Sequence, residues 1–331
     1  MRIITSLLLS TVGLSLWTAA AYAQVGPDNT PMVEPGTESM RYVEASTPQL
    51  LTQYWPVMYE IDQYPRFPSP DQTKGSDLRK RILDLRLLMD VYAFAYEPGL
   101  FEAYRDAADN AYEQVGLYKD LFDIQAIDKL PIDETYSAER LAKMNVALAP
   151  FRYGDFRNDL NDFLYHRQGQ PLNLEQRNQP RLWQIANARP DDSLDAAGNA
   201  ARLGALVIRN LSAQGLTVDN IVDEKQEAHF HDIRKALRSV MVMSDMFPSL
   251  SNATTADRDG LASIVKVYGQ TNDQFAAYHL SQLLGRDLGP RIADLQDTYG
   301  RAVGTVNQVV SGGQLNSYAA KLEAVQNSHH R

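Results

Sequence analysis

The amino-acid sequence predicts an all-α fold made of two pseudo-symmetric helical-bundle repeats. Segments in which apolar residues recur at spacings of three and four follow one another from about residue 77 to residue 326, as the buried faces of amphipathic helices require. Long alternating runs of β-branched residues do not occur in the sequence, so strands should be scarce. Two short motifs each occur twice, in the same order, which indicates an internal repeat.

The first 23 residues have the pattern of a cleavable secretory signal. Arg2 precedes an apolar run over residues 3–20, and an Ala-Tyr-Ala sequence at residues 21–23 follows it, as at signal cleavage sites. The alternative is an uncleaved anchor, because the run approaches the ~20 residues that span a bilayer. Polar interruptions of the run and the small residues at its end favour cleavage. We therefore expect export to the periplasm or the medium, without stable membrane insertion after cleavage.

Composition narrows the function classes of the remaining 308 residues. Because Arg2 is the only charged residue of the signal, 31 basic and 41 acidic side chains remain, a formal net charge of −10. This acidity disfavours a uniformly basic nucleic-acid binder but leaves room for a local basic patch. The sequence contains no Cys, which excludes disulfides, thiolate metal sites and Cys nucleophiles.

The distribution of turn residues divides the chain into a leader, two repeats and a connection. Residues 24–71 are expected to form a flexible leader with one short helix at about 48–60. Repeat one should cover about residues 72–166 and repeat two about residues 193–327, separated by a Pro- and Gln-rich connection over 167–192. Helices are predicted at residues 77–96, 100–118, 137–148, 155–165, 194–211, 223–246, 261–268, 272–284, 291–310 and 314–326.

Three local signals place the ends of these helices. Gly116 lies near the predicted end of the helix over 100–118, and Pro248 should stop the helix over 223–246. Thr254 and Asp257 have the spacing of a capping box in front of residues 261–268.

The repeat rests on two pairs of motifs. The sequence Ser-Asp-Leu-Arg-Lys at residues 76–80 matches His-Asp-Ile-Arg-Lys at residues 231–235, an offset of 155. Further along, Gly116-x-x-x-Asp120 matches Gly269-x-x-x-Asp273, an offset of 153. Each half is therefore expected to hold a helix that begins near the first motif, a turn, a second helix, and a third helix opened by the second motif.

The second copy of these motifs resembles a known family. His231-Asp-Ile-Arg-Lys-Ala-Leu-Arg238, followed by Gly269-x-x-Asn-Asp273, resembles the signature of the conserved-histidine α-helical domain (CHAD) family, and the likeness covers about residues 72–325. The resemblance implies two helical repeats about a pseudo-twofold axis, with basic side chains lining a groove between them. It also implies inorganic polyphosphate or a similar polyanion as the partner. We predict no cofactor.

A helical wheel of residues 223–246 separates a cationic face from an apolar one. Arg234, Lys235 and Arg238 fall within about 60° of His231. Ile233, Leu237, Val240 and Met243 fall on the opposite side. Arg offers a planar fork to phosphate oxygens and Lys a point charge. His231 is expected to add positive charge below its ordinary pKa, about 6.5. The alternative is the solvated outer face of an amphipathic helix, which looks the same on the wheel.

The first half offers a thinner set of cations, Arg79, Lys80 and Arg86. Against the family pattern, Ser76 stands in place of the histidine and Leu83 in place of the arginine seven residues later. Asp120 and Asp273 are candidates to orient the basic side chains. The alternative is that each caps the start of a helix after the preceding glycine.

Two function classes follow, together with a third that the sequence supports least. The first is an exported binding protein that holds inorganic polyphosphate or a similar polyanion. The second is a structural or protein-interaction helical domain that has lost this ligand. An enzyme is the third, since no G-x-S-x-G, H-E-x-x-H or Walker-type motif occurs. No metal site is predicted either: His229 and His231 point apart on a helix, and His329 and His330 lie at the C-terminal end, where we expect disorder.

Overall fold

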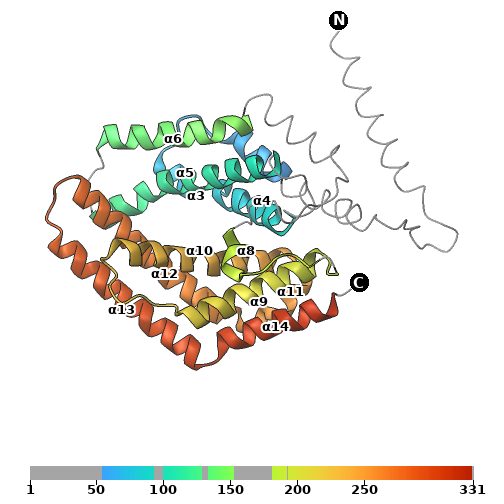
Figure 1. Cartoon of the computed structure of the whole chain (residues 1–331). Coiled ribbons are helices and arrows are strands. Elements are labelled where there is room, and N and C mark those ends of the chain that lie inside the picture. The colour runs from blue at the N-terminus through green and yellow to red at the C-terminus, as the bar shows by residue number, and fades with distance from the viewer. Residues whose placement is uncertain (1–53, 93–99, 129–132, 153–180, 192, 330–331) are drawn as a thin grey trace, which may run out of the picture.

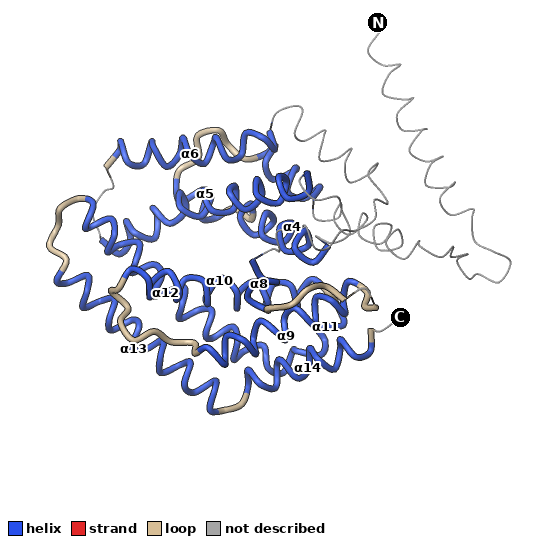
Figure 2. The backbone as a smooth tube through the Cα atoms, in the orientation of Figure 1, coloured by secondary structure: helices blue, strands red, loops and turns tan. Residues whose placement is uncertain are grey.

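The fold described by a computed structural model is all-α. The structure describes residues 54–92, 100–128, 133–152, 181–191 and 193–329. These residues form helices and their connections and include no β-strand (Figure 2), which confirms the all-α part of the prediction. The signal, the leader up to residue 53 and the helix predicted at 155–165 lie outside the described residues. None of the described helices combines the length and apolar content needed to cross a bilayer.

The first group of helices contains α3 to α6. A helical stretch over residues 54–63 precedes α3 (Pro70–Gly75), α4 (Leu78–Tyr92), α5 (Leu100–Asp128) and α6 (Glu134–Arg152). Ser69 starts α3 with a complete capping box, in which Ser69 and Gln72 exchange hydrogen bonds between side chain and backbone. The stretch 54–63 buries Tyr54, Met58 and Ile61 in the core. This helix overlaps the short helix predicted at about 48–60, but it is packed into the core and not part of a flexible leader.

The second group follows from residue 181 to the C-terminus. It comprises α8 (Arg181–Ala186), α9 (Ala196–Gln214), α10 (Glu224–Met246), α11 (Pro248–Thr254), the 3₁₀ turn η3 (Thr255–Asp257), α12 (Arg258–Leu283), α13 (Gly289–Ser311) and α14 (Gln314–Ser328). In this group α12 packs along α13, and α9 along α14 (Figure 1). The two groups meet where α4 packs on α10 and α5 packs on α12.

The α10 helix agrees with its prediction. Asp223 caps its N-terminus by accepting hydrogen bonds from two backbone N–H groups, and Phe247 with Pro248 ends it. The apolar side of the predicted wheel is the buried side of the helix: Ile233, Leu237, Val240 and Met243. On the cationic side, Lys235 is exposed, whereas His231, Arg234 and Arg238 are half-buried.

Two predicted helix breaks do not exist. α5 continues through Gly116 and α12 continues through Gly269, so each Gly-x-x-x-Asp motif lies inside a helix rather than opening one. A glycine in a helix interior costs only about 1 kcal/mol relative to alanine, which tertiary packing readily offsets. The capping box predicted at Thr254 is also wrong: its hydroxyl donates to the Leu250 carbonyl, and Asp257 makes no side-chain cap.

The predicted connection contains part of the core. Within residues 167–192, α8 buries the whole side chain of Trp183, and its indole N–H donates to the backbone carbonyl of Asp90 on α4 at 3.0 Å. Residues predicted only as a linker thus fasten the two groups of helices together.

We predict that Trp183→Ala lowers the free energy of unfolding by about 3–5 kcal/mol, because it leaves a large cavity. Trp183→Phe should cost less, since most of the packing survives and mainly the hydrogen bond to Asp90 is lost, about 1 kcal/mol. Trp55 is 48% exposed, and Trp55→Ala is the matched control, expected to cost roughly 1 kcal/mol or less. Urea denaturation measures all three. Similar losses at positions 55 and 183 would show that α8 does not anchor the core.

Candidate functional site

A small crevice between α4 and α10 gathers most of the cations that the sequence singled out. Positions 79, 83 and 86 share one face of α4, and positions 234 and 238 share one face of α10, because residues three or four apart are neighbours on a helix. Where the two helices pack together, these faces meet with one side chain of α5. We call this site the arginine crevice; its lining residues are Arg79, Leu83, Arg86, Tyr112, Arg234, Lys235, Arg238 and Ser239.

Most cations of the crevice have no acidic partner. Within the described part of the chain, no carboxylate lies within ion-pair distance of Arg79, Arg234, Lys235 or Arg238. The Nε atoms of Arg79 and Arg234 are buried and find no hydrogen-bond partner among the described residues. Burial, together with the like charges of Arg238 and Arg79, lowers the pKa of Arg234. The crevice therefore concentrates positive charge that no ion pair among the described residues neutralises, apart from the pair of Arg86 with Asp109.

Tyr112 of α5 lies against these arginines and was missed by the sequence analysis. Its ring centroid is 4.5 Å from Cζ of Arg79 and 5.3 Å from Cζ of Arg86, within the range of cation–π contacts. Burial on its own would raise the pKa of Tyr112, but the charges of Arg79, Arg238 and Arg86 lower it below its ordinary value. No motif marks this residue, because only the packing of α5 on α4 brings it to the site.

Arg86 is the exception among the crevice arginines. Its guanidinium forms an ion pair with Asp109 and reaches the Ser239 hydroxyl at 3.5 Å. The carboxyl of Asp90, one turn further along α4, is buried, and burial raises its pKa to about 6 although Arg86 opposes that shift. Arg86 thus lines the crevice, but much of its charge is already neutralised by Asp109.

Two glycines on neighbouring helices lie opposite arginines of the crevice, and one of them is needed for the close approach. A Cβ at Gly116 of α5 would lie 2.6 Å from Nη2 of Arg79, far inside van der Waals contact, so the guanidinium occupies space that only glycine leaves free. A Cβ at Gly269 of α12 would lie 3.8 Å from Nη2 of Arg234, an ordinary contact. The two glycines of the repeated motif therefore face the two arginines of the other repeated motif.

Lys80 and His231 are not among the lining residues of the crevice. Lys80 is exposed, and its charge acts on the buried carboxyl of Asp84. Nδ1 of His231 lies 2.8 Å from Oδ1 of Asn272, so this histidine joins α10 to α12. Burial and the charge of Lys235 lower the pKa of His231 below its ordinary value. Its protonation therefore needs a lower pH than the 6.5 expected from the sequence.

Asp120 and Asp273 lie beside one another where α5 packs on α12. Both occupy helix interiors, so the alternative role as helix caps is wrong. Lys119 pairs with Asp120 at 3.0 Å and with Asp123 at 2.9 Å. Burial, reinforced by the charges of Asp123 and Asp120, raises the pKa of Asp273 to about 6, while Lys119 and Arg234 oppose the shift. An acidic group thus lies next to the Arg234 side of the crevice.

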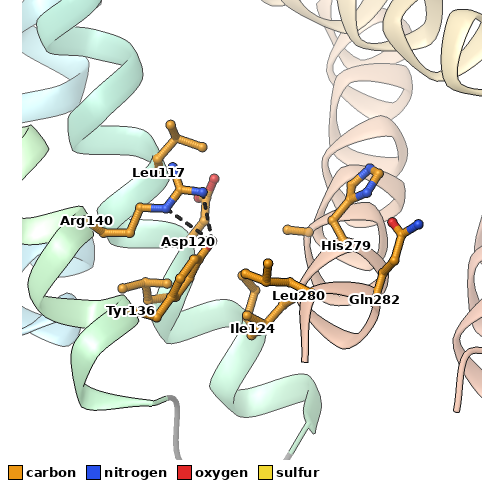
Figure 3. A pocket seen from close by; sticks show the side chains of 11 residues that line it. Leu117, Asp120, Ile124, Tyr136, Arg140, His279, Leu280 and Gln282 are labelled. Carbon is orange, nitrogen blue, oxygen red and sulfur yellow. Dashed lines mark hydrogen bonds between the residues drawn. The ribbon is translucent and has the colours of Figure 1, made fainter. Parts of the chain in front are cut away.

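A second, larger cavity of about 570 Å³ lies between α5, α6 and α12 (Figure 3). Figure 3 shows Arg140, Tyr136 and Asp120 on one side of it, facing His279 and Gln282 on the other. Its charged groups are engaged: Arg140 donates from Nε and Nη2 to the Tyr136 hydroxyl, and His279 pairs with Glu227 at 2.8 Å. With mainly apolar walls besides, this cavity offers an anion much less free positive charge than the arginine crevice does.

Histidines and carboxylates do not gather into a metal site anywhere in the described ranges. His329, expected to be disordered, has a defined place: its Nδ1 lies 2.8 Å from Oδ2 of Asp195, the residue that caps α9. His330 lies outside the described residues.

Comparison of the chain with protein-family models, with curated proteins and with solved structures found no match. The geometry of the arginine crevice is therefore the main ground for a functional assignment.

We predict that Asp273→Asn stabilises the protein at pH 7 and removes part of its pH dependence. In the unfolded chain this carboxyl ionises near its ordinary pKa of 3.8, whereas in the folded protein it ionises only near 6. The folded state therefore holds the extra proton between these values, and stability falls as the pH rises from about 4 to 6. The variant should gain about 1–3 kcal/mol at pH 7. Urea titrations at pH 4 and pH 7 measure it, with the exposed Asp106→Asn as control; an equal effect of both substitutions would contradict the assignment.

Proposed function

We propose that this protein binds inorganic polyphosphate or a similar polyanion in the arginine crevice. The proposal rests mainly on one observation: four cations from two helices line the same crevice, and none of them has a carboxylate partner among the described residues. They are Arg79, Arg234, Lys235 and Arg238. Bringing like charges together away from water costs several kcal/mol per ion unless a countercharge is present. A bound polyanion supplies that countercharge and accepts hydrogen bonds from the guanidinium groups.

We further propose that the two groups of helices are the two copies of an internal repeat. The contacts of the paired motifs correspond: Arg79 packs on Gly116 between α4 and α5, and Arg234 packs on Gly269 between α10 and α12. Matching apolar positions also correspond, because Leu78 and Ile233 are both fully buried. In this arrangement α4 and α10 are equivalent helices, and the crevice lies where the two halves meet, in agreement with the resemblance to the CHAD family.

Two features of the site favour the alternative function, a structural or protein-interaction domain without this ligand. Arg86 is neutralised by Asp109, and Leu83, where the family pattern has arginine, contributes no charge. The net charge of −9 over the full chain also opposes anion binding. Absence of polyanion binding at low salt would favour this alternative.

We predict that Arg234→Ala/Arg238→Ala weakens the binding of long-chain polyphosphate by tenfold or more, since each charge-assisted hydrogen bond contributes roughly 1.5–3 kcal/mol. Binding to the unmodified protein should also weaken steeply between low and moderate salt, because each contact releases counterions from the chain. Isothermal titration calorimetry measures both effects.

The matched control is Lys143→Ala/Arg301→Ala, which removes the same net charge from side chains already paired with Glu139 and Asp297. This control should bind almost as well as the unmodified protein. Equal losses in the two double variants would mean that net charge, and not the crevice, determines binding.

We also predict that Gly116→Ala weakens polyphosphate binding while Gly269→Ala does not. The new methyl group at position 116 must displace the Arg79 guanidinium, whereas the one at position 269 meets Arg234 at an ordinary contact distance. Both changes raise helix propensity, by about 1 kcal/mol, so thermal unfolding should show both variants folded. Equal binding by the two variants would exclude Arg79 from the site.

A further inference from the structure

The arginine crevice is too small for a long ligand. Its cavity volume is only about 10 Å³, roughly what one water molecule needs, whereas pockets for drug-sized ligands measure about 300–1,000 Å³. Buried side chains restrict it further, since Leu83, Ser239 and Tyr112 are each less than a tenth exposed. The space therefore leaves room for no more than one small group between the arginines, and not for the passage of a chain.

Carboxylates lie on both sides of this space. Beyond Arg86 are its ion-pair partner Asp109 and the buried Asp90. On the side of Arg234 is Asp273, with Asp120 and Asp123 next to it. A chain of phosphates that ran through the crevice would meet negative charge in either direction, and like charges at short range in a partly buried setting repel strongly.

We propose that the crevice captures the terminal phosphate group of a phosphate chain and not its internal groups; this inference rests on the proposed function. A terminal group carries about −1.5 to −2 charge at pH 7 and presents three acceptor oxygens. An internal group carries a single negative charge and presents two free oxygens. The three arginines without a carboxylate partner, Arg79, Arg234 and Arg238, more than balance the charge of the terminal group and can donate to each of its three oxygens.

The position of Lys235 fits the same arrangement. It lines the crevice but is exposed to solvent, so its ammonium group lies at the mouth. There it contacts the phosphate next to the terminal one as a point charge. The rest of the chain then extends into solvent, away from the acidic body of the protein.

The test compares pyrophosphate with cyclic trimetaphosphate by calorimetry on the unmodified protein at moderate salt. The two anions have similar net charge near neutral pH, but only pyrophosphate has terminal groups. Pyrophosphate should bind roughly tenfold more tightly or better, the effect of one or more lost charge-assisted hydrogen bonds. Long-chain polyphosphate should bind with about the affinity of pyrophosphate when both are counted per chain end. In Arg234→Ala/Arg238→Ala the preference for pyrophosphate should disappear.

Two results would overturn the inference, and they differ. Equal binding of pyrophosphate and trimetaphosphate, or an affinity per chain that rises with chain length, would show that internal groups are bound; the proposed function would then stand without terminal selectivity. Absence of binding by all three anions at low salt would remove both the inference and the proposed function.

Discussion

The packing of α4 against α10 brings arginine side chains into one partly buried space. The rest of the site depends on which negative charges and which apolar contacts offset the repulsion between these arginines. On the Arg86 side the protein supplies its own countercharge through Asp109. Around Arg79, Arg234 and Arg238 the described residues provide no ion pair. Burial and the neighbouring positive charges therefore lower the pKa of Arg234. Such a concentration of like charge opposes folding, so the apolar core must offset it.

That core is continuous across both groups of helices. One cluster of buried side chains runs from Tyr54 to Val325, and Trp183 joins α8 to α4 within it. The buried faces of α4 and α10 belong to this cluster, while their other faces form the crevice. The helices that carry the arginines are therefore held firmly by their apolar sides, as a preorganised anion site requires.

The contacts on the far side of the crevice couple the arginines to α5 and α12. Gly116 lets the Arg79 guanidinium lie directly on the backbone of α5, and the ring of Tyr112 covers one side of it. Behind Arg234, the acidic group around Asp273 tempers the positive potential. Both features limit the space and the positive charge available to a ligand. The packing of α5 and α12 therefore restricts the size of the group that the crevice can bind.

The sequence by itself determined the elements in which local periodicity agrees with tertiary packing. The all-α class, the limits of α10 and its division into apolar and cationic faces follow from spacing alone, because a helix repeats every 3.6 residues whatever it packs on. Arg234 and Arg238 were predicted as candidates from their positions on that wheel, and Arg79 and Arg86 from the matching helix of the first half. Only the tertiary structure decided that α5 and α12 continue through Gly116 and Gly269, since packing outweighs the small helix cost of a glycine. It also decided that Tyr112 belongs to the site, that Asp109 neutralises Arg86, and that His231 faces Asn272. Each of these depends on a partner far away in the chain, and periodicity within a helix carries no information about which distant side chain will lie beside it.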